Sequence, residues 1–162
     1  EPIITVFCGA IVILSMFLPW YLPYYQFSLE FFINTKTSGW DMIEFTAAPL
    51  IVCISGIFMV VLPLITLLLR SAKRLSPRRN LYLNLLVSVT TTMALIGLVW
   101  FIIDAGFNIG SSVAFSVIGG GVYISLAAAI LGFCFSIITT VKAKSRCSVD
   151  YISQPPDEPA EE

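Results

Sequence analysis

The polar side chains inside the apolar stretches of this chain are amides and hydroxyls, and ionised groups are almost absent there. In the stretch 81–103, Asn84, Ser88 and Thr91 recur at positions i, i+4 and i+7, which places them on one face of a helix. In lipid, such side chains hydrogen-bond to a neighbouring helix or to carbonyls of their own helix. We therefore expect this face to hold helices together. A path for an ion or a small ligand is the alternative use.

Residues for acid–base, nucleophilic or metal chemistry form no recognisable set in the sequence. Histidine is absent, which excludes every catalytic triad and every metal site that needs an imidazole. The four cysteines contain no CxxC pair, so thioredoxin-like, zinc-ribbon and c-type haem sites are excluded as well. No nucleophile–base pair or phosphate-binding loop stands out. We expect a protein that is not an enzyme and holds no metal or cofactor.

The composition of the chain indicates a membrane protein. Of 162 residues, 57% are hydrophobic and 12% are charged, whereas a soluble domain carries about 25% charged residues. Four apolar stretches, 3–22, 47–69, 81–103 and 113–141, reach the roughly 20 residues that a helix needs to cross the bilayer. The sequence predicts an all-α, multi-pass integral membrane protein with a bundle of four transmembrane helices.

The cations predict the orientation of these helices. Of the nine Lys and Arg residues, five lie between the second and third stretches and three follow the fourth: Arg70, Lys73, Arg74, Arg78, Arg79, Lys142, Lys144 and Arg146. The positive-inside rule assigns this side to the cytoplasm, so both termini are expected to be cytoplasmic. The net charge of −1 gives no overall basic character for binding nucleic acid. Other integral membrane subunits and lipid are the expected partners.

Two parts follow from this topology. Residues 1–146 form the expected transmembrane domain, with an outer loop at 23–46. Its start, Glu1-Pro2, lacks the positive region of a signal peptide, so we expect the first stretch to remain as a span. Residues 147–162 are an acidic, proline-containing segment that cannot build a core, and they are expected to form a cytoplasmic tail.

Small side chains follow one another along the fourth stretch at helical spacing. Because lipid tails are as apolar as leucine, helices in a membrane associate where small residues let their backbones approach closely. This face is expected to pack against the bundle or against a neighbouring subunit. Its residues are Gly121, Ser125, Ala128, Gly132 and Ser136.

Aromatic residues gather around the predicted outer loop. Trp20, at the end of the first stretch, is expected at the headgroup level, where an indole is half buried. Phe27, Phe31 and Phe32 form an apolar cluster that we expect to lie on the membrane surface or against a partner. After Gly39, Trp40 is expected to anchor at the interface, and Asp41 to cap a short helix.

Two short motifs carry a resemblance. Leu18-Pro19-Trp20 followed by Ser38-Gly39-Trp40-Asp41 resembles a loose group of small prokaryotic four-span membrane proteins of uncharacterised function, over residues 3–70 and in general topology. The four-span plan with the larger loop first is also similar to claudins and tetraspans. The chain departs from claudins because no cysteine lies between Cys8 and Cys53, so the disulfide of the claudin loop cannot form.

The sequence leaves three kinds of function to weigh. A non-catalytic accessory or scaffold subunit of a larger membrane complex accounts for the absent chemistry, the small-residue face and the apolar outer loop. A small channel or transporter would use the face of Asn84, Ser88 and Thr91, and a claudin-like or tetraspan-like organiser of the membrane stands beside it. A membrane enzyme is disfavoured because no polar groups converge. We expect the accessory subunit.

Overall fold

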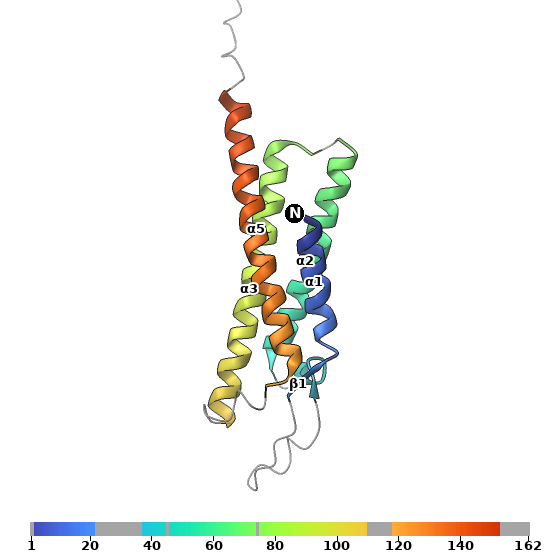
Figure 1. Cartoon of the computed structure of the whole chain (residues 1–162), viewed down its shortest axis with the longest axis vertical. Helices are drawn as coiled ribbons and strands as arrows, with labels where there is room; N and C mark the ends of the chain where they lie inside the picture. Colours follow the sequence, from blue (N-terminus) through green and yellow to red (C-terminus); the bar gives the residue numbers. More distant parts are fainter. Residues whose placement is uncertain (1, 22–36, 45, 74, 110–117, 153–162) are drawn as a thin grey trace, which may run out of the picture.

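The computed structural model describes residues 2–21, 37–44, 46–73, 75–109 and 118–152, and four long helices dominate these ranges (Figure 1). The helices are α1 (Pro2–Ser15), α2 (Ala47–Ser71), α3 (Pro77–Ile109) and α5 (Gly120–Ile152). Two short strands, β1 (Pro19–Tyr21) and β2 (Thr37–Ser38), and a 3-10 helix, η1 (Asp41–Glu44), complete the described part. The prediction of an all-α protein is therefore confirmed in its main elements.

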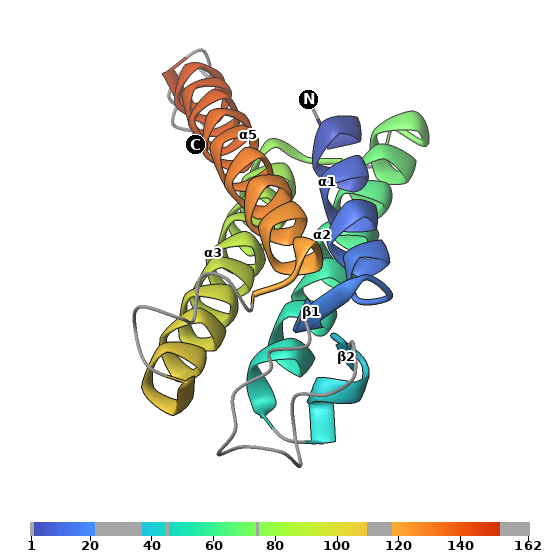
Figure 2. The same ribbon diagram turned by 60° about the horizontal axis from the view of Figure 1, so that its bottom comes forward.

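The long helices pack as a ring in which each contacts two neighbours. α1 lies against α2 and α5, and α3 lies against the other sides of α2 and α5 (Figure 2). The core fills the centre of this ring with small and medium apolar side chains such as Val12, Val52 and Ala129. The outward faces are also apolar, with half-exposed Ile, Leu, Val and Phe on all four helices. A protein with apolar residues both inside and outside is suited to lipid rather than to water.

Three of the helices have the length and apolarity to cross a bilayer: α2, α3 and α5. The helices predicted over 47–69 and 81–103 are thereby confirmed, and α3 extends beyond its predicted range at both ends. α1 is apolar but has 14 residues. At 1.5 Å per residue it measures about 21 Å, less than the hydrocarbon thickness of about 30 Å.

The prediction of one helix over 3–22 is wrong at the C-terminal end of that helix. α1 ends at Ser15, and a tight turn follows in which Met16, Phe17 and Leu18 donate backbone hydrogen bonds to carbonyls three residues earlier. Pro19 cannot continue the helix because it lacks an N–H and disfavours helical geometry at Leu18. The chain continues as β1, which pairs antiparallel with β2 in the register Pro19 to Ser38.

The fourth helix is also displaced from its predicted range of 113–141. Ile118 and Gly119 are not helical, and residues 110–117 lie outside the described ranges. The N–H of Gly119 donates instead to the carbonyl of Trp20 at 2.8 Å, so this segment lies against β1. α5 begins at Gly120 and ends at Ile152, within the segment that the sequence assigned to the tail.

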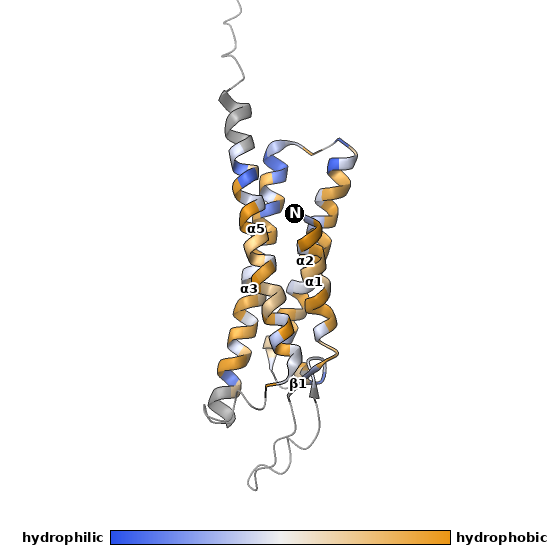
Figure 3. Cartoon of the chain, in the orientation of Figure 1, coloured by the Kyte–Doolittle hydropathy of each residue, from blue (hydrophilic) through white to orange (hydrophobic). Residues whose placement is uncertain are grey.

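The two ends of the bundle differ in character. One end, here called the basic end, carries Arg70, Lys73, Arg78, Arg79, Lys142 and Lys144. Figure 3 shows the hydrophilic residues of α2, α3 and α5 gathered there. The start of α1 and the end of α5 point to the same end (Figure 1). The opposite end, here called the strand end, holds β1 and β2.

Candidate functional site

The small-residue face of α5 lies inside the ring. Ser125 and Ser136 are fully buried, and Gly121, Ala128 and Gly132 are buried beside them. A Cβ atom added at Gly132 would lie 2.6 Å from Cε of Met59 and 3.3 Å from Cβ of Cys8. The face therefore packs α5 against α1, α2 and α3 of its own chain.

Hydroxyl pairs join α5 to its neighbours across this face. Thr91 and Ser136 are 3.2 Å apart, Ser88 and Thr140 are 3.1 Å apart, and Ser15 of α1 is paired with Ser125. The hydroxyls of Ser88, Thr91 and Ser136 also lie 2.8–3.1 Å from carbonyls of their own helices. Because a hydroxyl has one proton, each donates either to that carbonyl or to the hydroxyl on the neighbouring helix. Among the described residues, no buried side-chain nitrogen or oxygen lacks a hydrogen-bond partner. The polar groups of the interior are thus used in holding the helices together.

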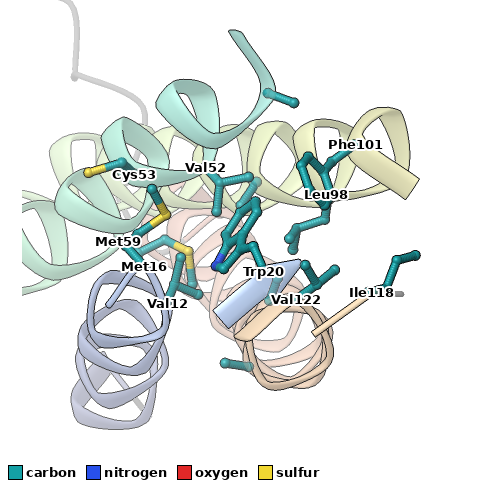
Figure 4. Close-up of a cluster of buried hydrophobic side chains, with 14 of the residues drawn as sticks. Val12, Met16, Trp20, Val52, Cys53, Met59, Leu98, Phe101, Ile118 and Val122 are labelled. Atoms are coloured by element: carbon teal, nitrogen blue, oxygen red, sulfur yellow. The ribbon is translucent and has the colours of Figure 1, made fainter. Parts of the chain in front are cut away.

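Trp20 closes the strand end of the ring. Its side chain is 0% exposed, and Figure 4 shows the indole among Val52 of α2, Phe101 of α3 and Val122 of α5. The rings of Trp20 and Phe101 meet edge to face, with centroids 4.9 Å apart, a favourable aromatic geometry. The indole Nε1–H donates to the carbonyl of Ser15 at 3.0 Å. The prediction that Trp20 is half buried at the headgroup level is wrong, because β1 turns it into the bundle.

Glycines make room for this tryptophan. A Cβ atom at Gly39 would lie 2.8 Å from the indole Nε1, and one at Gly121 would lie 2.7 Å from the indole Cδ1. At Gly119 the nearest atom would be the backbone oxygen of Pro19, at 2.1 Å. The first outer motif therefore fits against the glycine of the second motif and against the glycines that open α5. Three segments distant in sequence form one unit, here called the Trp20 plug.

Ser38 and Asp41 form a reciprocal cap on η1. The Asp41 carboxylate accepts from the Ser38 hydroxyl at 2.7 Å and from the Ser38 N–H at 2.9 Å, while the Ser38 Oγ accepts from the Asp41 N–H at 3.3 Å. This arrangement is a capping box, in which Ser38 rather than Asp41 occupies the cap position. The Ser38 hydroxyl, and then its N–H, hold the pKa of Asp41 below its ordinary value.

The other predicted outer contacts are placed only in part. Trp40 is 41% exposed and its ring lies against that of Phe17, with centroids 5.8 Å apart. Together they form an exposed aromatic pair beside the plug. Phe27, Phe31 and Phe32 lie outside the described residues, so their expected position on the membrane surface or on a partner stays a prediction.

A polar pocket opens at the basic end, where all four helices contribute to its wall. Its volume is about 60 Å³. The sequence alone does not predict this convergence. Arg70 and Lys142 are far apart in the sequence, and only the fold brings them to the same pocket. The lining residues are Pro2, Thr66, Arg70, Asn80, Asn84, Thr139, Lys142 and Ala143.

Groups for redox or metal chemistry are dispersed in the described part of the chain. Cys8, Cys53 and Cys134 are free thiols, two of them buried and the third exposed on α5. Within the described ranges, no three His, Cys, Asp or Glu residues come together as a metal site would require. The described polar residues thus pack the helices at the centre and line a small pocket at the basic end.

Comparison with known proteins gives no further assignment. No family model, no curated protein and no solved structure matches the chain. The resemblance carried by Leu18–Trp20 and Ser38–Asp41 therefore stays a prediction, although the two motifs are in contact within the Trp20 plug.

Proposed function

We propose that this chain is a non-catalytic accessory or scaffold subunit of a larger membrane protein complex. In this proposal all four long helices lie in the membrane, and the basic end faces the cytoplasm. The positive-inside rule supports this orientation, since loops rich in Lys and Arg stay on the cytoplasmic side. Both ends of the chain are then cytoplasmic, and the Trp20 plug faces outward.

The observation that carries the proposal is the close packing of the described side chains at the centre of the bundle. Each of the hydroxyls of Ser88, Thr91 and Ser136 lies within hydrogen-bond distance of a hydroxyl on a neighbouring helix and of a carbonyl of its own helix. The Trp20 plug fills the strand end of the ring. A bundle with a closely packed centre supports a role in which the outer faces make the functional contacts.

Those outer faces include a broad apolar stripe on α3. It forms a shallow depression of about 390 Å³. In the proposed complex, this stripe and the exposed pair Phe17 and Trp40 contact other membrane subunits. The small-residue face of α5 is excluded from that role because it is buried within the chain. The lining residues of the depression are Thr92, Leu95, Ile96, Val99, Trp100 and Ile103.

A channel or transporter is the second candidate, and the polar pocket favours it because Asn84 of the pocket is one turn from Ser88. Such a path would have to continue past Gly132, where a Cβ atom would lie 2.6 Å from Met59, and past Trp20 at the strand end. Both positions are closely packed. The accessory role therefore has the better support.

Mild detergent extraction from the native membrane, followed by native mass measurement, tests the proposal. We expect the chain in an assembly much heavier than 17.8 kDa that contains other membrane proteins in fixed ratio. A chain that extracts alone, and that conducts ions or solutes when reconstituted in liposomes, would establish the channel instead.

A further inference from the structure

The side of α3 that faces away from the bundle changes character along its length. Its first turn carries Arg78 and Arg79, which are both exposed, and the second turn carries Tyr82, which is 66% exposed. The residues that follow on this side are apolar and exposed, among them Leu86 and Val89. Arg78, Tyr82 and Val89 follow one another at i, i+4 and i+11, which places them on one side of the helix. We call this side the outer face of α3.

The start of α3 is fixed by a local cap. The Ser76 Oγ accepts from the N–H of Arg79 at 3.3 Å, and the Ser76 carbonyl accepts from the N–H of Asn80 at 3.0 Å. Pro77 follows Ser76 at the first helical position, where proline is well tolerated. The two arginines therefore project from a defined turn at the basic end, where Figure 3 shows α3 to be hydrophilic.

The side chains at this end of the outer face are suited to a lipid headgroup. A guanidinium presents a planar set of N–H donors that matches the oxygens of a phosphate. A tyrosine at the membrane interface has its ring among acyl chains and its hydroxyl among headgroups. Among the described residues, none forms an ion pair or hydrogen bond with the side chain of Arg78, Arg79 or Tyr82.

The apolar part of the outer face has the length of one lipid leaflet. It extends from Tyr82 to Met93, which is 49% exposed. At 1.5 Å per residue, these eleven steps measure about 16 Å, or about half of the hydrocarbon thickness of 30 Å. The arginines lie one turn beyond Tyr82, at the level of the headgroups. The face therefore matches the charge and the length of a single phospholipid.

This part of α3 is separate from the depression that we assign to a partner subunit. The depression is lined by residues from Thr92 to Ile103, which lie in the other half of the membrane. A lipid beside Tyr82 and Val89 thus leaves the depression free for protein.

We propose that the outer face of α3 binds an anionic phospholipid, with the headgroup on Arg78, Arg79 and Tyr82 and an acyl chain along Leu86 and Val89. Charge-assisted hydrogen bonds from the arginines select an anionic lipid over a zwitterionic one. The helix dipole favours negative charge in this first turn, and a headgroup beside the two arginines supplies it.

The test uses the full chain in nanodiscs that contain phosphatidylcholine and phosphatidylglycerol in equal amounts. Both lipids have a phosphate, but the choline cation leaves phosphatidylcholine without net charge. A photoreactive residue replaces Val89, and mass spectrometry identifies the class of each cross-linked lipid. The matched position is Ile138 of α5, which is exposed and lies at a similar depth, because Ser88 pairs with Thr140 and Thr91 with Ser136.

Two double variants separate a local site from the general charge of the basic end. Arg78→Gln with Arg79→Gln removes both guanidinium groups from the outer face of α3. Lys73→Gln with Lys144→Gln removes the same charge from exposed positions at the same end, on other elements. Tyr82→Phe tests the hydroxyl without any change of charge.

We expect Val89 to cross-link phosphatidylglycerol over phosphatidylcholine roughly fivefold or more above the ratio at Ile138, since one basic residue near anionic lipid typically contributes about that factor. The arginine variant should reduce the ratio at Val89 to that at Ile138. The lysine variant should leave it unchanged, and Tyr82→Phe should lower it by a smaller factor. Thermal unfolding in the same nanodiscs checks that each variant is folded.

Three results would overturn the proposal. The first is an equal lipid ratio at Val89 and Ile138 in the parent chain. The second is an equal loss in the arginine and lysine variants, which would assign the effect to the general charge of the basic end. The third is a cross-linked dimer of the chain at Val89 in place of a lipid, which would assign the face to a second copy. None of these results depends on whether the chain belongs to a larger complex.

Discussion

Trp20 and Trp40 differ in burial although the sequence predicts a similar environment for both. Each belongs to a short motif near the strand end, and each fits the usual preference of tryptophan for the membrane interface. The structure buries Trp20 completely and leaves Trp40 at 41% exposure. The difference arises because β1 pairs with β2 and turns Trp20 inward, toward Phe101.

Replacing Trp20 with alanine should destabilise the protein strongly. A large buried aromatic side chain truncated to alanine typically costs about 3–5 kcal/mol, because the cavity that remains is only partly filled. Trp20→Phe should cost less, since a ring stays against Phe101 and only the hydrogen bond to Ser15 is lost. Thermal unfolding in a mild detergent measures both. Trp40→Ala is the matched control, and an equal loss in that variant would contradict the burial of Trp20.

Asp41 should titrate at a lower pH than an ordinary aspartate. The hydroxyl and the N–H of Ser38 hold its pKa below 3.8 in the folded protein. A lowered pKa means that the capping box adds stability above the ordinary pKa and loses it as the pH falls through the folded-state pKa. The carboxyl carbon shift of Asp41, followed by NMR against pH, measures the midpoint.

Ser38→Ala is the control for this titration, because it removes the hydroxyl donor and keeps the N–H. The midpoint should rise toward 3.8 in that variant. A midpoint at or above 3.8 in the parent chain would show that the capping box does not form.

At the scale of elements, the three glycines before and at the start of α5 have different surroundings. Cβ atoms at Gly119 and Gly121 would lie 2.1 Å and 2.9 Å from backbone oxygens of Pro19 and Ser15, which cannot move cheaply. A Cβ atom at Gly120 would meet nothing within 4 Å. The triplet therefore has two positions that need glycine and one that does not.

Alanine substitutions at the three positions should therefore have different effects on stability. Gly119→Ala and Gly121→Ala should each lower the stability by about 1–3 kcal/mol, the usual cost of overpacking. Gly120→Ala should leave it unchanged or raise it slightly, since alanine favours a helix over glycine. Thermal unfolding of the three variants in one detergent is the measurement. Equal effects at all three positions would contradict the packing of β1 against the start of α5.

The elements differ in how well the sequence predicts them, for physical reasons. α2 and α3 follow from local composition, since each contains 23 consecutive residues without a charge. The end of α1 and the start of α5 depend on contacts between distant segments, above all the bond from Gly119 to the Trp20 carbonyl. Hydropathy alone extends both helices through those residues and cannot reveal the bond.

The candidate site divides in the same way. The buried face from Gly121 to Ser136 could be recognised because small residues at helical spacing signal close packing. Its hydroxyl partners on α1 and α3 could not, since the pairing depends on the order of helices in the ring. The pocket between Arg70 and Lys142 was also hidden, because charge counting placed both at one end without placing them in one cavity.

At the scale of the whole molecule, the described part of the bundle has a closely packed centre, a buried Trp20 at the strand end and apolar outer faces. This arrangement leaves the apolar outer faces as a broad surface on which a partner could act. In an accessory subunit, part of that surface must contact protein in the native membrane. In a protein that acts alone, all of it contacts lipid.

Photo-cross-linking in the native membrane distinguishes these two states most directly. A photoreactive residue is placed in turn at Phe7, Ile57, Ile96 and Ile130, which are exposed positions on α1, α2, α3 and α5. We predict that at least one position, Ile96 on the α3 stripe first among them, forms a cross-link of reproducible mass to a different membrane protein. Cross-links to lipid alone at all four positions would contradict the accessory role.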